Sequence, residues 1–313
     1  LMQDWPLLCH RIIDHAAIQH AERPVVTRSV EGPIHTTNYR EIRKRALKLA
    51  KRLDKDGIRL GDRVATLAWN TWRHLECWYG ILGIGAVYHT VNPRLFPEQI
   101  AWIVNHAEDR VMMTDQTFIP LLEKLADKLP TIERYVVLTD AAHMPQTSLK
   151  NAVPYEEWLA ETDDDFTWKS FDENTAAGMC YTSGTTGNPK GVVYSHRSNV
   201  LHSMMAAMPD AMNTSARSII LSIVPMFHVN AWGLPFSAVL TGAKLVFPGP
   251  KLSAPEVLTD LITQEGVTVS AGVPTVCLPL LQYAREQGRS LKPLDSGHCT
   301  ITGVPSPNST ISG

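Results

Sequence analysis

The residues best suited to chemistry form one run of hydroxyl side chains, glycines and a lysine. The run is Thr182-Ser183-Gly184-Thr185-Thr186-Gly187-Asn188-Pro189-Lys190-Gly191. Glycines let backbone N–H groups approach an anion closely, and hydroxyl groups add hydrogen-bond donors and oxygen ligands for a hard cation. The lysine adds positive charge. This composition indicates a loop that binds phosphate groups.

The residues around this run indicate which elements hold it. Apolar residues lead into the run (Ala176, Ala177, Met179), and a β-prone segment, Val192-Val193-Tyr194, follows it. We therefore expect the order strand, phosphate loop, strand. A Walker A loop does not fit, because its spacing G-x-x-x-x-G-K-[ST] is absent and no helix is expected after the lysine. A polar turn without a ligand is the simpler structural alternative, but such turns need only two or three of these residues.

A second informative run contains a phenylalanine, a histidine and a tryptophan close together after an apolar segment. It is Val224-Pro225-Met226-Phe227-His228-Val229-Asn230-Ala231-Trp232-Gly233. The run follows a predicted buried strand, and open α/β sheets bind ligands at the carboxyl ends of their strands. Considered alone, His228 is more typical of a hydrogen-bonded structural histidine, and Trp232 is more typical of a core residue.

Strand and helix patterns alternate along most of the chain. We predict strands over 24–28, 34–36, 64–69, 87–91, 111–114, 135–138, 218–224, 244–247 and 267–270, the first two as a hairpin. We predict helices over 39–55, 71–82, 97–106, 118–128, 198–208, 254–265 and 274–287, and one that begins near Ala231. Such alternation is typical of βαβ units, so we expect an α/β fold with a mostly parallel sheet. Residues 140–174 are less regular, and the helically spaced Met204, Met205, Met208 and Met212 are expected to pack in the protein.

Composition and charge limit which classes of protein this chain can belong to. The 313 residues are 44% hydrophobic and 19% charged, with a formal net charge of -2, which gives no electrostatic case for a nucleic-acid partner. Five scattered cysteines without C-x-x-C spacing favour reduced thiols in the cytoplasm. No apolar run approaches the ~18 residues of a membrane span. We therefore expect a cytoplasmic globular protein with no membrane span.

The sequence resembles a known superfamily. From Met179 to Lys190 it matches, at every position, the signature of the AMP-binding, adenylate-forming superfamily of acyl-CoA synthetases, luciferases and adenylation domains. Further blocks resemble bacterial medium- and long-chain fatty-acyl-CoA synthetases: residues 225–232, 242–246, 271–276, 39–42, 61–65 and 91–95. The resemblance covers residues 7 to 294. It implies mixed, mostly parallel sheets flanked by helices, as in the N-terminal domain of an acyl-CoA synthetase-like fold.

The resemblance also implies an activity and roles for residues. A fatty carboxylate attacks the α-phosphate of Mg·ATP to give acyl-AMP and pyrophosphate, and the thiol of CoA then displaces AMP to form the thioester. The implied ligands of the ATP phosphates are Thr182, Ser183, Gly184, Thr185, Thr186, Gly187 and Lys190, with the hydroxyl of Thr182 as a Mg²⁺ ligand. Val229 and Trp232 would lie at the nucleotide and at the mouth of an acyl tunnel, with Trp232 as a gate and His228 on the wall between. Relatives often form homodimers through this domain.

The sequence departs from this family after Leu294. A tyrosine that stacks on adenine, a glutamate that binds Mg²⁺, and a C-terminal domain with the adenylation lysine are features of the family that these 313 residues lack. Residues 296–313 contain no Asp, Glu, Lys or Arg and predict a disordered tail. We therefore expect residues 1–295 to be a partial N-terminal domain that is incomplete for catalysis. Two alternatives are an inactive nucleotide- or acyl-binding module and a relative that activates aryl or amino acids.

Overall fold

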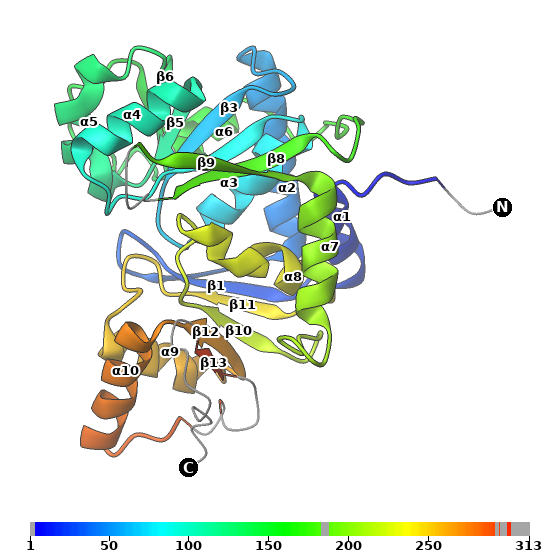
Figure 1. Cartoon of the computed structure of the whole chain (residues 1–313), viewed down its shortest axis with the longest axis vertical. Coiled ribbons are helices and arrows are strands. Elements are labelled where there is room, and N and C mark those ends of the chain that lie inside the picture. Colours follow the sequence, from blue (N-terminus) through cyan, green and yellow to red (C-terminus); the bar gives the residue numbers. More distant parts are fainter. Residues whose placement is uncertain (1–3, 183–187, 292–293, 295–298, 302–313) are drawn as a thin grey trace.

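The computed structural model describes residues 4–182, 188–291, 294 and 299–301, which form two helix-covered sheets (Figure 1). The strands of the seven-stranded sheet, in spatial order, are β7 (Ala152–Pro154), β6 (Arg134–Val137), β5 (Asp109–Thr114), β3 (Arg63–Leu67), β4 (Val87–Thr90), β8 (Ala176–Thr182) and β9 (Lys190–Ser195). Only β8 and β9 pair antiparallel in this sheet. The helices that accompany these strands are α3 (Trp72–Gly83), α4 (Pro97–Ala107), α5 (Ile119–Leu125) and α6 (Tyr155–Ala160).

The six-stranded sheet combines the start of the chain with its last described elements. In spatial order its strands are β13 (Cys299–Ile301), β12 (Val269–Gly272), β10 (Ile219–Ser222), β11 (Lys244–Phe247), β1 (Pro24–Arg28) and β2 (Ile34–Asn38). Only the β1–β2 hairpin is antiparallel. The other helices are α1 (His10–Gln19), α2 (Tyr39–Lys55), α7 (His196–Ala207), α8 (Leu234–Thr241), α9 (Pro255–Glu265) and α10 (Pro274–Glu286). The expected α/β fold with mostly parallel sheets is confirmed.

One continuous hydrophobic core joins the two sheets. In Figure 1, α3 and α8 lie between them, and every residue of α3 is buried. α3 begins where the Thr71 hydroxyl accepts a hydrogen bond from the His74 N–H, and α2 begins in the same way at Asn38. No helix in the described part of the chain is long and apolar enough to cross a membrane.

The structure corrects four expectations. The irregular region 140–174 contains β7 and α6, and the helix expected near Ala231 begins only at Leu234. Cys299–Ile301, within the predicted tail, form a strand that pairs in parallel with β12, so the expectation of a tail without strands is wrong at these residues. The remaining tail residues lie outside the described ranges. Of the four methionines expected to pack, Met204, Met205 and Met208 are 51 to 63% exposed, and α7 buries the face opposite Met204 and Met205. Met212 is partly buried and packs on the main core, as expected.

Candidate nucleotide and acyl site

The two ends of the predicted phosphate loop lie side by side on a hairpin. β8 ends at Thr182 and β9 begins at Lys190, and these two residues are direct partners in the antiparallel register. Cβ atoms of such partners lie about 5 Å apart on the same face of a sheet. Both residues are exposed. The strand, loop, strand order is therefore confirmed, while Ser183, Gly184, Thr185, Thr186 and Gly187 lie outside the described residues.

Aromatic side chains on α4 pack against the end of β8, the strand that leads into the loop. The Tyr181 hydroxyl and the His106 Nδ1 atom share a hydrogen bond of 2.7 Å, and the His106 ring stacks on Trp102 with ring centroids 4.5 Å apart. Gly191, across the hairpin, leaves room for the Tyr181 ring, since a Cβ there would meet it at 3.2 Å. α4 therefore fixes the direction in which β8 delivers Thr182.

Asn70 connects the second predicted segment to the seven-stranded sheet. It is fully buried just beyond β3, and its amide nitrogen donates to the backbone carbonyls of Ser222 (2.9 Å) and Val224 (2.8 Å). Its amide oxygen accepts from the Met226 N–H at 2.7 Å. Three hydrogen bonds from one side chain thus fix the backbone that enters the segment. Sequence reasoning missed Asn70, although a polar residue directly after a predicted buried strand could have indicated it.

Residues Val229–Gly233 form a left-handed turn. Their φ angles are 48°, 50°, 49°, 54° and 69°. The left-handed region costs a non-glycine residue about 1–2 kcal/mol, and β-branched residues are found there least often. A right-handed helix therefore cannot start before Leu234, which explains the late start of α8. Strain of this kind is concentrated at functional sites in proteins.

The left-handed turn lies against the strand that precedes the phosphate loop. The Thr90 hydroxyl on β4 lies within hydrogen-bonding distance of the Asn230 side-chain oxygen (3.2 Å) and of the Met179 carbonyl on β8 (3.4 Å). The Cys180 thiol contacts the backbone of Val229. The structure therefore brings the two sequence motifs together at β8, a few residues before Thr182.

The three predicted gate residues differ in exposure. His228 is solvent-accessible, Val229 is 43% exposed, and Trp232 is partly buried and packs on the main core. Partial burial, followed by the positive charge of Arg94, lowers the pKa of His228 below its ordinary value. At neutral pH this histidine is therefore uncharged. A neutral ring suits the wall of an acyl tunnel better than it suits an anion-binding role.

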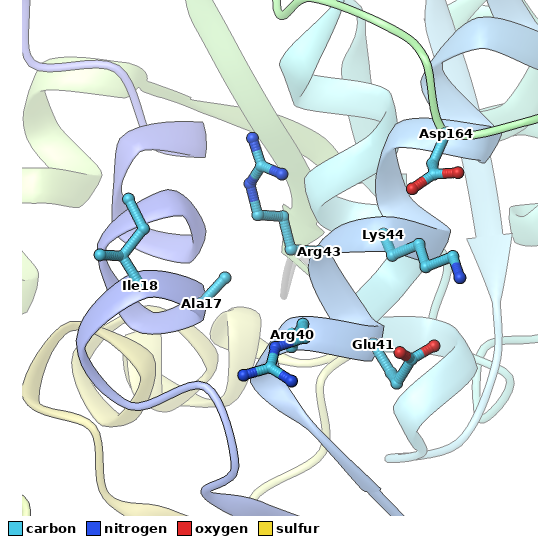
Figure 2. Close-up of a pocket in the computed structure, with 7 residues that line it drawn as sticks. All are labelled: Ala17, Ile18, Arg40, Glu41, Arg43, Lys44 and Asp164. Carbon is cyan, nitrogen blue, oxygen red and sulfur yellow. The ribbon is translucent and has the colours of Figure 1, made fainter.

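The hollow drawn in Figure 2 lies apart from these residues. It has a volume of about 440 Å³ between α1 and α2 and is lined by Ala17, Ile18, Arg40, Glu41, Arg43, Lys44 and Asp164. Two of its cations are already paired, Arg43 with Asp14 at 2.5 Å and Arg40 with Glu22 at 2.7 Å. None of its lining residues belongs to either sequence motif, so we do not assign a nucleotide to it.

The fold and the hairpin define an α/β protein whose two sequence motifs meet at one strand of the seven-stranded sheet. The chain belongs to the AMP-binding enzyme family, whose model matches residues 13–311. This match confirms the resemblance drawn from the motifs and extends beyond Leu294, where the motifs end.

Similar curated proteins are acid:CoA ligases. The chain is 46% identical over 305 residues to a medium-chain-fatty-acid–CoA ligase of Ectopseudomonas oleovorans, a match that covers 97% of this chain and 55% of the relative. It is 45% identical over 310 residues to a long-chain-fatty-acid–CoA ligase of Thermus thermophilus, covering 99% and 55%. A 3-methylmercaptopropionyl-CoA ligase of Ruegeria pomeroyi is 46% identical over 306 residues, covering 98% and 56%. The chain spans about half the length of these relatives.

Solved structures confirm the fold. An anthranilate CoA ligase in complex with anthranoyl-AMP superposes with a TM-score of 0.82 at 20% identity, covering 93% of this chain and 55% of that one. The N-terminal domain of FACL13 from Mycobacterium tuberculosis gives a TM-score of 0.80 at 24% identity, covering 96% and 71%. The described elements therefore have the arrangement found in acyl-CoA ligases.

The left-handed turn gives a prediction about stability. The Val229→Gly protein should have a free energy of unfolding about 1 kcal/mol higher than that of the Val229→Ala protein, because a positive φ strains alanine but not glycine. Val229→Gly and Val229→Ala remove nearly the same side chain, so their difference isolates the backbone. At Val193, an exposed residue on the extended strand β9, the order should reverse, since glycine weakens a strand. Urea unfolding of the glycine and alanine variants at positions 229 and 193 tests this prediction. If the alanine variant were the more stable protein at both positions, Val229 would not have a positive φ.

Proposed function

We propose that this chain provides the phosphate-binding loop and the acyl gate of an ATP-dependent fatty acid:CoA ligase. The reaction would activate a medium- or long-chain fatty acid through acyl-AMP to acyl-CoA. The observation that carries the proposal is the hairpin at Thr182 and Lys190, because it holds the family signature at its turn and contacts the gate segment through Thr90. The fatty-acid–CoA ligases at 45 and 46% identity support the choice of substrate.

The proposed roles follow from the charge of the reactants. A carboxylate is a weak nucleophile toward a triphosphate, so the site must neutralise phosphate charge and hold the attack in line. The backbone and hydroxyl groups of Ser183, Gly184, Thr185, Thr186 and Gly187 bind the β- and γ-phosphates together with Lys190. The positive ends of these donors reduce the repulsion between the incoming carboxylate and the phosphates.

The residues present fit a Mg²⁺ ion in part. The Thr182 hydroxyl is a hard oxygen donor on an exposed residue at the end of β8, which is the type of ligand that Mg²⁺ binds. Mg²⁺ usually takes one or two protein ligands and completes its shell with phosphate oxygens and water. A bound Mg²⁺ would neutralise charge on the phosphates, and the Thr182 hydroxyl would be its protein ligand at the end of β8.

The gate residues line the path of the acid. Val229 and Trp232 lie at the mouth of the acyl tunnel, with Trp232 as the gate and His228 on the wall toward the nucleotide. The contact between the Val229 backbone and the Cys180 thiol on β8 supports this assignment, since the acyl and phosphate groups must meet there. The second substrate is the thiol of CoA. We also propose a cytoplasmic location and a homodimer, which the family resemblance implies. Residues 1–295 form part of the adenylate-forming domain in this assignment.

The relatives also support a second candidate acid. The 3-methylmercaptopropionyl-CoA ligases of two Ruegeria species are 46 and 44% identical to this chain, as similar as the fatty-acid–CoA ligases are. A titration with octanoate, palmitate, 3-methylmercaptopropionate and benzoate, followed by Trp232 fluorescence, ranks these acids. A response to benzoate alone would favour an aryl-activating relative instead.

Binding of Mg·ATP, measured by isothermal titration calorimetry, tests the phosphate loop. Thr182→Val should weaken binding of Mg·ATP about 10-fold or more, because a charge-assisted contact is lost, and should change binding of ATP in EDTA far less. Thr36→Val, an exposed threonine on strand β2, is the matched control and should change neither. If Thr182→Val weakened ATP binding equally with and without Mg²⁺, Thr182 would not be a ligand of the metal.

Pyrophosphate exchange on the purified chain separates a self-sufficient adenylating enzyme from a binding module. From residues 1–313 by themselves we expect ATP binding without exchange, because the sequence blocks to which the resemblance assigns the adenylation lysine and the metal glutamate are not among these residues. Acid-dependent exchange above background would contradict this expectation and establish that the chain catalyses the first step alone.

A further inference from the structure

The left-handed turn Val229–Gly233 is strained, yet it carries both Val229 and Trp232. A strained backbone persists only where surrounding contacts determine it. We propose that Asn230 is a positioning residue for the acyl site: its side-chain amide holds the turn left-handed and thereby fixes Val229 and Trp232. The consequence for ligands rests on the proposed function, whereas the effect on the turn does not.

The side chain of Asn230 is anchored on a rigid part of the core. Asn230 is 5% exposed; its oxygen accepts from the Thr90 hydroxyl at 3.2 Å, and its nitrogen lies 3.4 Å from the Tyr88 hydroxyl. Both partners are buried on β4, and the Tyr88 ring stacks on Trp78 with centroids 4.4 Å apart. A turn in the crossover between β10 and α8 is thus tied to the opposite sheet.

The residue types agree with this role. Asparagine tolerates the left-handed region better than other residues with a Cβ, whereas Val229, Ala231 and Trp232 do not favour it. The turn therefore needs external contacts to persist. His202 on α7 supplies one more, because its Nε2 atom lies 3.0 Å from the Trp232 carbonyl. Gly233 makes this approach possible, since a Cβ there would overlap the His202 ring.

Loss of the amide contacts has a defined structural outcome. α8 starts at Leu234, directly after the turn, and Pro235 must stay in its first helical turn, so a relaxed 229–233 segment would return to negative φ angles without extending α8. That change rotates Trp232 away from its partly buried position on the core. Asn230 therefore controls where the indole lies without needing to touch a substrate.

Three substitutions at position 230 separate conformational tolerance from hydrogen bonding. Asn230→Ala removes both, Asn230→Gly keeps only the tolerance of a positive φ, and Asn230→Asp keeps the shape, the tolerance and an acceptor for Thr90. The readout is the fluorescence of Trp232 alone, obtained by subtracting the spectrum of the matching Trp232→Phe protein. We expect acrylamide quenching of Trp232 to rise about twofold or more in Asn230→Ala, less in Asn230→Gly, and to stay near the parent value in Asn230→Asp.

Thr90→Val tests the same contact from the other side, without replacing any residue of the turn. It should raise Trp232 quenching, while Thr114→Val should not, because Thr114 is an equally buried threonine on β5 whose hydroxyl donates to the Leu67 carbonyl on β3. This pair keeps the proposal testable if Asn230→Ala does not fold. Unchanged quenching in Asn230→Gly and Thr90→Val would overturn the proposal.

Ligand affinity gives the functional readout. Octanoate and palmitate should bind about 10-fold more weakly to Asn230→Ala and within about twofold of the parent to Asn230→Asp, since a lost buried hydrogen bond has that effect. If Trp232 quenching responds but the parent chain binds neither acid, the proposed function fails and the positioning role stands. If the parent chain binds both acids and all variants bind equally, the positioning role fails and the proposed function stands.

Discussion

Gly178→Ala is expected to lower the free energy of unfolding by about 3 kcal/mol, the upper part of the range for overpacking a buried site. Gly178 is buried on β8, and a methyl group there would overlap the Tyr88 ring. That ring cannot move aside, because it is fully buried, stacks on Trp78 with an interplanar angle of 10°, and lies beside Phe236. The methyl group must therefore push β8 away from β4.

The same displacement should affect the site. β8 ends at Thr182, and the Tyr88 hydroxyl lies beside Asn230, so both motifs are coupled to the position of this ring. We expect Gly178→Ala to weaken Mg·ATP binding as well as to lower the urea midpoint. Gly191→Ala on β9 is the comparison, because a Cβ there meets the half-buried Tyr181 ring at 3.2 Å, a tight contact that needs only a small shift of the ring, so the loss of stability should be smaller, about 1 kcal/mol. Equal losses in both variants would show that the Tyr88 contact is not the cause.

The sequence predicted those elements whose local signals agree with their tertiary environment. The helix over 39–55 is found at Tyr39–Lys55, because its apolar residues share one face, Asn38 caps its start and Gly57 follows its end. The strand, loop, strand order around residue 182 is confirmed for similar reasons. Glycine and hydroxyl residues stand between two β-prone runs, and no competing helical pattern exists there.

The left-handed turn could not be predicted from local signals. The run Val229–Trp232 has no glycine, and Val229, Ala231 and Trp232 disfavour the left-handed region, so a helix was expected near Ala231. The decisive contacts come from Thr90 and His202, which are far away in the chain. The same holds for Asn70, whose three backbone partners lie more than 150 residues later. Helical spacing also gave no information about which side of α7 is buried, so the expectation of packing is wrong for Met204 and Met205, whereas Met212 does pack on the core.

Asp115→Asn should stabilise the protein at pH 8 by about 2–4 kcal/mol and leave its stability at pH 4 nearly unchanged. Asp115 is buried just beyond β5, and its carboxylate accepts a hydrogen bond of 2.6 Å from the Trp69 N–H. Burial raises the pKa of Asp115 to about 7, against the lowering effects of that hydrogen bond and of the Arg73 charge. An amide oxygen can accept the same hydrogen bond without carrying a charge.

The sign follows from proton binding. An unfolded aspartate titrates near pH 3.9, so between about pH 4 and pH 7 the folded chain holds a proton at Asp115 that the unfolded chain has released. Stability contributed by this group therefore falls as pH rises through that window and is constant above it. Buried His10, His74 and His196 act in the opposite sense below pH 6.5, because burial lowers their pKa to about 4, 4 and 3.

The measurement must therefore be a difference between two proteins at each pH. Urea unfolding of the parent and of Asp115→Asn at pH 4.5, 6 and 8 cancels the histidine contribution, which both proteins share. The difference should grow from about 1 kcal/mol at the lowest pH to its full value at pH 8. Asp165→Asn, at an exposed position, should show no such trend. A difference independent of pH would mean that Asp115 ionises as an ordinary aspartate, and that water reaches the end of β5 beside Trp69.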